Sequence, residues 1–302
     1  MDEKSKHLLT RTEDRISFLY IEMAKVVQTD YSVEIVAGNT RTEIPITTIN
    51  CLILGPGVTI THRAVANIAN AGCSICWMGE LGCTFYTYGE PATNSAKNLL
   101  HQMQVHEHKQ SHIDVVHRMY NIRYPDKHWK SKTLEQLRGL EGLTVKECYT
   151  KCAEKYGVTW NGRTYKDDDF DNSDTVNQYI TSLNHMLYSI IQAAIVTMGY
   201  SPHIGYIHTG KLNAFTFDIA DLYKESITIP LAFELASQGS YNRRKALSAL
   251  RDSIIKYKLM KRIPRDIHEI MRDNSSNSSI EAELLLWDGK NFVNARKNYS
   301  ET

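Results

Sequence analysis

The chain has 302 residues and a mass of 34.5 kDa, which suggests two domains at the usual size of roughly 100–200 residues each. A hydrophobic share of 42%, a charged share of 23% and a mean hydropathy of −0.38 exclude collagen-like, disordered and integral-membrane classes. The formal net charge of +1 would, over the whole chain, exclude a strongly basic nucleic-acid-binding protein.

The first 92 residues are predicted to form a strand-rich domain. Runs rich in Ile, Val, Thr and aromatic residues alternate there with turn signals containing Gly, Asn or Pro. The expected strands cover residues 15–27, 32–36, 44–54, 73–78 and 83–88, with one helix over 62–71. The segment 91–95 is a candidate domain boundary, with Ser95 as a candidate N-cap of the next helix.

Beyond this boundary the apolar spacing becomes helical. Between Val176 and Met198 apolar residues recur every three or four positions, with Asp174 as candidate N-cap and Gly199 as the stop. The opposite face is polar but uncharged, so we expect this helix to be buried or to face protein or a ligand. Weaker helical patterns cover residues 97–124, 134–156 and 242–261.

The predicted fold class is therefore α+β. We expect a β-sheet domain over residues 1–92, a larger all-α domain over 93–273, and a linker and tail over 274–302. The first 15 residues are polar and mixed in charge, unlike a signal or transit peptide. The longest stretch without a charged residue, 175–210, contains Asn, Gln and His residues that a bilayer centre disfavours. We expect a cytoplasmic protein with no membrane span.

The net charge near zero conceals strongly charged blocks. Residues 96–166 sum to +6, residues 167–240 to −7 and residues 241–265 to +8. The last block holds nine basic side chains and one acidic side chain, the footprint of phosphate binding. A solvated helix face is the alternative interpretation. If nucleic acid binds here, the acidic block requires a divalent cation between carboxylates and phosphates.

Glu141 is one candidate ligand for such a cation. On the helical interpretation of 134–156 it shares a face with Leu137, Val145 and Cys148, where a carboxylate is costly unless it is paired or metal-bound. Gly139 and Gly142 flank it and could let a backbone or ligand approach closely. The alternative is a glutamate that pairs with an arginine or reaches out to solvent.

A second cluster follows the long helix. Asp218 and Asp221 stand three residues apart and would share one helix face, and His208 precedes them in a glycine-bounded loop. Two carboxylates and one imidazole suit Mg²⁺ or Mn²⁺ better than a structural zinc ion. The alternative is an N-capping Asp218 beside an ordinary core histidine.

Three segments together resemble the Cas1 family of CRISPR-associated proteins, and most closely its type I-E branch. They are QLRGLEG at 136–142, YGVTWNGRTY at 156–165 and GYSPHIGYIHTGKLNAFTFDIADLYK at 199–224. The resemblance covers nearly the whole chain up to about residue 265. It implies that residues 93–273 form a metal-dependent catalytic domain.

The resemblance also implies roles for individual residues. Glu141, His208 and Asp221 would bind Mg²⁺ or Mn²⁺, and Asp218 would assist as a neighbouring catalytic acid. Residues expected to contact DNA by resemblance are Lys211, Arg41, Arg163, Tyr165 and Tyr188. The basic block adds Arg243, Arg244, Lys245, Arg251, Lys256 and Lys258.

Some positions depart from the family pattern. Thr59, Ala66 and Thr84 stand where type I-E relatives often carry arginine, and Met23 stands at a stacking-tyrosine position. The tail after Pro264 does not resemble the proline-rich tails of relatives, so a role in recognising the protospacer-adjacent motif does not transfer.

The function implied is that of a DNA integrase and endonuclease of CRISPR adaptation. It would join the 3′-hydroxyl ends of double-stranded protospacer DNA to the CRISPR repeat beside the leader by transesterification. The implied partners are a second copy of the chain, forming a homodimer, and the small protein Cas2 in a larger complex. Two alternatives remain: a repair nuclease that cuts branched DNA, and a non-catalytic scaffold that holds DNA ends.

Overall fold

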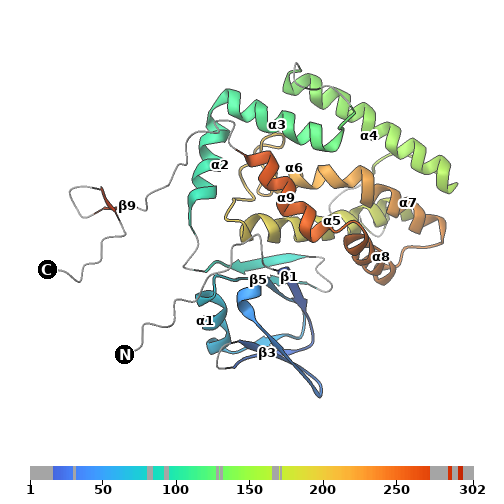
Figure 1. The fold of residues 1–302 in the computed structure, drawn as a ribbon. Coiled ribbons are helices and arrows are strands. Elements are labelled where there is room, and N and C mark those ends of the chain that lie inside the picture. The colour runs from blue at the N-terminus through green and yellow to red at the C-terminus, as the bar shows by residue number, and fades with distance from the viewer. Residues whose placement is uncertain are drawn as a thin grey trace, which may run out of the picture. The chain divides into compact units, whose positions relative to one another are not determined.

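The computed structural model describes residues 16–29, 32–79, 84–91, 95–126, 129, 132–164, 170, 172–272, 285–287 and 292–294. The chain divides into two compact units, Met1–Met271 and Arg272–Thr302. In the first unit a strand-rich part that includes one helix precedes a helical part, so the predicted α+β class is confirmed (Figure 1). In the second unit β9 (Leu285–Trp287) pairs antiparallel with β10 (Phe292–Asn294).

Two four-stranded sheets form the strand-rich part. The first sheet has β1 parallel to β5, β5 parallel to β7 and β7 antiparallel to β8. Its strands are β1 (Ile16–Ile21), β5 (Ile49–Leu54), β7 (Ser74–Met78) and β8 (Phe85–Gly89). The second sheet, in spatial order, contains β4 (Thr40–Ile44), β3 (Val33–Ala37), β2 (Lys25–Gln28) and β6 (Thr59–Ile60). The short 3₁₀ turn η2 (Ile46–Thr48) lies between β4 and β5, and the helix α1 (His62–Asn70) lies between β6 and β7.

One predicted strand is two strands in the structure. Met23 adopts a left-handed φ of 52°, which breaks the extended run over residues 15–27. As a result β1 ends at Ile21 in the first sheet, while β2 begins at Lys25 in the second. The run 44–54 is likewise divided, because η2 lies between β4 and β5.

The pleat of β5 explains how the first sheet is buried on both faces. Leu52 and Leu54 belong to a core shared with the second sheet and α1. Cys51 and Ile53 point the other way and pack against Ala193 of the helix α5 (Thr175–Thr197). A strand buried on both faces needs a continuous apolar run, which INCLIL nearly provides.

Helices form the rest of the first unit. The predicted helix over 97–124 is two helices that meet at His108, and the run 242–261 spans α8 and the start of α9. Their bounds are α2 (Lys97–Glu107), α3 (Lys109–Arg123), α4 (Leu134–Tyr156), α5 (Thr175–Thr197), α6 (Ala214–Tyr223), α7 (Ile229–Ser237), α8 (Arg243–Lys256) and α9 (Leu259–Met271). A π-helical turn, η4 (Lys224–Thr228), joins α6 to α7.

The helix α5 lies between the first sheet and the other helices (Figure 1). The Asp174 side chain caps it by accepting from the backbone N–H of Asn177, as expected. Most of its residues are buried, polar Asn177 and Asn184 included, which confirms the expectation from its uncharged polar face. Within the described ranges, no helix combines the length and apolarity needed to cross a membrane.

Candidate active site

The loop between α5 and α6 is held in place from two helices. The buried Gln102 of α2 donates to the carbonyls of Ser201 and Ile204 at 3.0 and 2.9 Å. His112 of α3 binds the Tyr206 carbonyl at 2.8 Å. A Cβ at Gly205 would collide with the backbone of the following turn, so the tight course of this loop requires glycine there.

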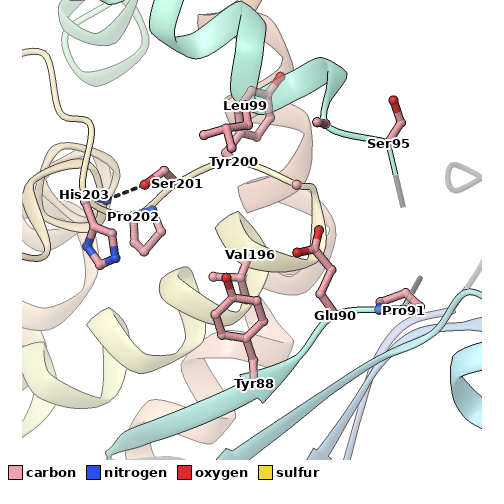
Figure 2. A pocket seen from close by; sticks show the side chains of 12 residues that line it. Tyr88, Glu90, Pro91, Ser95, Leu99, Val196, Tyr200, Ser201, Pro202 and His203 are labelled. Carbon is pink, nitrogen blue, oxygen red and sulfur yellow. Dashed lines mark hydrogen bonds between the residues drawn. The ribbon is translucent and has the colours of Figure 1, made fainter. Parts of the chain in front are cut away.

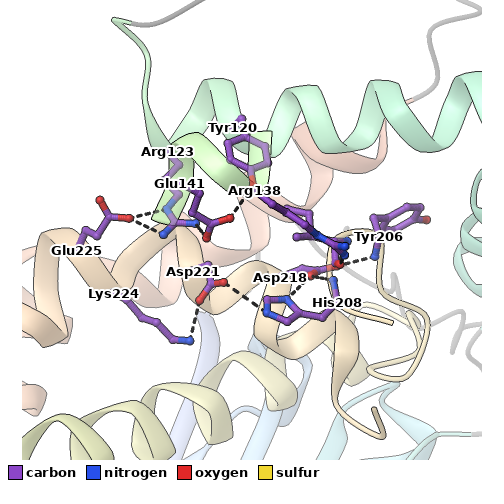
Figure 3. A network of polar contacts seen from close by, with 11 residues as sticks. Tyr120, Arg123, Arg138, Glu141, Tyr206, His208, Asp218, Asp221, Lys224 and Glu225 are labelled. Atoms are coloured by element: carbon purple, nitrogen blue, oxygen red, sulfur yellow. Dashed lines mark hydrogen bonds and ion pairs between the residues drawn. The ribbon is translucent and has the colours of Figure 1, made fainter. Parts of the chain in front are cut away.

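Asp218 ties this loop to α6. Its buried carboxylate accepts from the backbone N–H groups of Tyr206, Ile207 and His208 at 2.5, 3.1 and 2.8 Å. It also binds the Nδ1 of His208 at 2.7 Å. Both oxygens are therefore occupied, and Asp218 fixes the histidine rather than facing a ligand (Figure 3). It lies inside α6, so it does not cap the helix.

This hydrogen bond determines which nitrogen of His208 is available. With Nδ1 on Asp218, Nε2 faces the Oδ2 of Asp221 at 3.8 Å. The bond to Asp218 raises the pKa of His208 above its usual value; burial opposes this rise, and the charge of Asp221 adds to it. The half-buried imidazole thus gives Nδ1 to a carboxylate and leaves Nε2 available, the arrangement typical of a metal-binding histidine.

Asp221 is paired with a lysine from η4. The Nζ of Lys224 lies 2.6 Å from Oδ1 of Asp221 and 4.8 Å from the centre of the Tyr188 ring. Burial by itself would raise the pKa of Asp221, but Lys224 and Arg123 outweigh it and hold that pKa below its usual range. Asp221 is therefore ionised at neutral pH.

Glu141 of α4 is held by two neighbours on α3. Its Oε1 accepts from the Nη1 of Arg123 at 2.5 Å, and its Oε2 from the hydroxyl of Tyr120 at 2.6 Å. The same arginine donates through Nε to Glu225 at 2.9 Å (Figure 3). This pairing is the alternative that the sequence left open for Glu141. The flanking glycines have no close neighbour, because a Cβ at Gly139 or Gly142 would meet no described atom within 4 Å.

Glu141 and His208 line the same cavity, of about 350 Å³. Arg138 and Lys211 lie on its wall with Ile207 and Thr209, so its lining combines one acidic and two basic side chains with the imidazole. A larger cavity, of about 460 Å³, lies where β8, α2 and the end of α5 meet (Figure 2). Its lining contains none of the predicted metal ligands.

The residues fit Mg²⁺ or Mn²⁺ in donor type, while the carboxylates of Glu141 and Asp221 are now paired with Arg123 and Lys224. Two carboxylates and one imidazole nitrogen are ligands that both ions accept. No three His, Cys, Asp or Glu side chains in the described part of the chain stand together as a ready metal site. To bind an ion, Glu141 would turn away from Arg123, and Asp221 from Lys224.

The predicted DNA-contacting residues are dispersed over the described surface. Lys211 is exposed at the cavity, and Arg41 is exposed on β4, where it pairs with Glu34. Arg163 instead clamps its segment to α5, because it donates to Asn177 at 2.6 Å and Thr181 at 2.8 Å. The predicted DNA-contacting residues on or just after α8 are all exposed: Arg243, Arg244, Lys245, Arg251, Lys256 and Lys258. Tyr165 lies outside the described residues.

Sequence reasoning missed Arg123, Glu225 and Tyr120. Glu225 could have been found, because Asp218, Asp221 and Glu225 follow at helical spacing and fall on one face of α6 and η4. Arg123 carries no such signal. It is one of many basic residues in its block, and only the packing of α3 against α4 and η4 brings it to two carboxylates.

Fold and site together define an α+β protein whose helical part carries an acidic centre beside exposed basic residues. The acidic centre consists of four carboxylates: Glu141, Asp218, Asp221 and Glu225. A crystal structure of a TtCas1–DNA complex has this fold, with a TM-score of 0.79 and 36% identity over 86% of this chain and 98% of that chain. A casposase bound to its integration product shares the fold at a TM-score of 0.57 and 12% identity, covering 85% and 96% of the two chains.

Sequence comparison identifies the family. Residues 114–266 match the family model of the CRISPR associated protein Cas1. The CRISPR-associated endonuclease Cas1 2 of Chlorobaculum tepidum is 38% identical over 277 residues, which cover 91% of this chain and 94% of that protein. The CRISPR-associated endonuclease Cas1 of Escherichia coli is 36% identical over 228 residues, 75% of each chain. The chain belongs to the Cas1 family; the type I-E branch stays a prediction.

Proposed function

We propose that this protein is a divalent-metal-dependent DNA endonuclease and integrase of CRISPR adaptation. It joins the 3′-hydroxyl ends of double-stranded protospacer DNA to the CRISPR repeat beside the leader. The observation that carries the proposal is the shared cavity of Glu141 and His208, with Asp221 beside His208. Relatives named as endonucleases and the DNA-bound relative support it.

Glu141, His208 and Asp221 are the proposed ligands of Mg²⁺ or Mn²⁺. When bound, the ion supplies polarisation of the scissile phosphate and neutralisation of charge developing on it. Asp218 keeps the histidine Nδ1 occupied, so that Nε2 carries the lone pair. Asp218 therefore assists by orienting His208, one of the proposed metal ligands.

The basic residues position DNA around this centre. Lys211 and Arg138 lie on the wall of the cavity, where phosphates of a bound strand would meet them. The exposed basic residues of α8 bind backbone phosphates, which gives affinity without reading bases. Tyr188, whose ring contacts the Nζ of Lys224 beside the acidic centre, is proposed as an aromatic contact to DNA.

The partners proposed are a second copy of the chain and the small protein Cas2. The homodimer would bring two such centres to the two ends of one protospacer, and Cas2 would join two homodimers. A cytoplasmic location, where the DNA substrates are found, completes the proposal.

The test is an integration assay. Labelled linear DNA with 3′-hydroxyl ends is incubated with a supercoiled plasmid carrying leader and repeat, with Mg²⁺ or Mn²⁺, and with or without Cas2. We expect label to join the plasmid, EDTA to abolish joining, and Asp221→Ala to abolish joining while DNA binding persists. Glu154→Ala, which removes an exposed acid near the end of α4, is the control and should leave joining intact.

The outcome also separates the alternatives. Metal-dependent cutting of branched DNA without joining, whether or not Cas2 is present, would identify a repair nuclease instead. DNA binding that survives EDTA, with neither cutting nor joining and no effect of changing Glu141, would identify a scaffold.

A further inference from the structure

Glu225 is a nearly buried carboxylate to which the proposed function assigns no role. Its side chain is 15% exposed and lies on the π-helical turn η4, next to Lys224. Its Oε1 accepts from Nε and Nη2 of Arg123 and from the hydroxyl of Tyr124. A carboxylate that receives this many donors is held firmly in one orientation.

Arg123 divides its guanidinium between Glu225 and a proposed metal ligand. Nε and Nη2 go to Glu225, and Nη1 goes to Glu141. The arginine side chain is only 7% exposed, so water compensates little of its charge. Without Glu225 the positive charge of Arg123 would be left to Glu141, its remaining ion-pair partner, and to the nearby Asp221.

The charges of this ion-paired network favour a divalent cation. With His208 neutral, the network has net charge −2 from four carboxylates and two cations: Glu141, Asp218, Asp221, Glu225, Arg123 and Lys224. Arg138 and Lys211 are exposed at the cavity, where water and salt screen them. Neutralising Glu225 would reduce the network to −1.

We propose that Glu225 is a positioning residue for the divalent-cation site, acting through Arg123. It anchors and neutralises the guanidinium, so that Glu141 can exchange Arg123 for a metal ion. This inference rests on the proposed function, because it presupposes that Glu141 is a ligand. Glu225 itself touches neither metal nor DNA in this scheme.

The test measures Mn²⁺ binding to the full chain without DNA, by electron paramagnetic resonance. Glu225→Gln should raise the Kd for Mn²⁺ by about 10–100-fold, the usual effect of losing a carboxylate behind the ligands. Glu225→Asp, which keeps the charge, should restore most of the affinity. Tyr124→Phe is the matched control: it removes a hydrogen bond to the same oxygen without changing charge, and should alter the Kd far less.

The decisive variant is the double substitution Arg123→Gln with Glu225→Gln. It returns the network to −2, so we expect Mn²⁺ to bind more tightly than to Glu225→Gln alone. A merely structural role predicts a double variant that binds no better, and that result would overturn the inference, as would an unchanged Kd in Glu225→Gln. Circular dichroism in EDTA checks that each variant is folded.

Failure of the proposed function would look different. If the unaltered protein does not bind Mn²⁺, or if Asp221→Ala leaves binding unchanged, the proposed metal site itself is wrong. If the unaltered protein binds Mn²⁺ and Asp221→Ala weakens it, while Glu225→Gln has no effect, only the role of Glu225 is refuted.

Discussion

Asp218→Asn should destabilise this protein more than any other single amide substitution at the acidic centre. The carboxylate uses Oδ2 for the N–H groups of Tyr206 and Ile207, and Oδ1 for the N–H and ring of His208. An amide has one acceptor oxygen, so two of these buried bonds are lost. At about 1.5–3 kcal/mol for each hydrogen bond to a charged group, the free energy of unfolding should fall by about 3–6 kcal/mol.

Urea unfolding followed by circular dichroism, in EDTA at pH 7, measures this loss. Asp221→Asn is the matched control, because Asp221 pairs with Lys224 and faces the ring of His208 but binds none of the loop's backbone. We expect it to cost less than half as much. Two results would refute the idea that Asp218 holds the α5–α6 loop in place. One is a loss below about 1 kcal/mol for Asp218→Asn, the size of a single net hydrogen bond. The other is an equal loss of unfolding free energy in the two variants.

Three further predictions concern pH, packing and DNA. Because the pKa of His208 is raised in the folded protein above its usual 6.5, its stabilising contribution is fully present below pH 6.5 and lost as pH rises through the raised value. Thermal unfolding from pH 5 to 9 should show this decline, and His208→Gln should flatten it. Arg163→Ala should lower the free energy of unfolding by about 1–2 kcal/mol in urea titrations, since its hydrogen bonds clamp α5, and no loss would contradict this role. Arg251→Ala and Lys256→Ala should each reduce the slope of log Kd for DNA against log salt by about 1, and unchanged slopes would place the DNA elsewhere.

Local patterns predicted α1, α4 and α5 well because their signals lie within each segment, but they merged α2 with α3 and α8 with the start of α9, and they marked no helix over α7. The apolar spacing and the cap at Asp174 located α5 within one or two residues. The division of residues 15–27 into two strands was not predictable, because it depends on one left-handed residue, Met23, and on which sheet each half joins. Strand propensity is equally strong on both sides of that break.

The site was predictable in its donors and not in its counter-ions. The motif around His208 and Asp221 marks two of the proposed ligands by residue type and spacing, and the structure brings these two side chains together. Pairing of Glu141 with Arg123 is a contact between α4 and α3, across a separation that no periodicity encodes. The same holds for Asp218, whose four acceptor contacts depend on the loop folding back over α6.

The position of α5 has a consequence for how the chain loses its structure. Ala193 and Val196 pack under the first sheet, while Leu183 and Leu187 of the same helix belong to the core of the helical part. Neither part can melt without exposing a face of this shared helix, so we expect the first unit to unfold in one cooperative transition. A cut near residue 92, where the sequence predicts a domain boundary, would then leave two fragments that stay associated until both denature together.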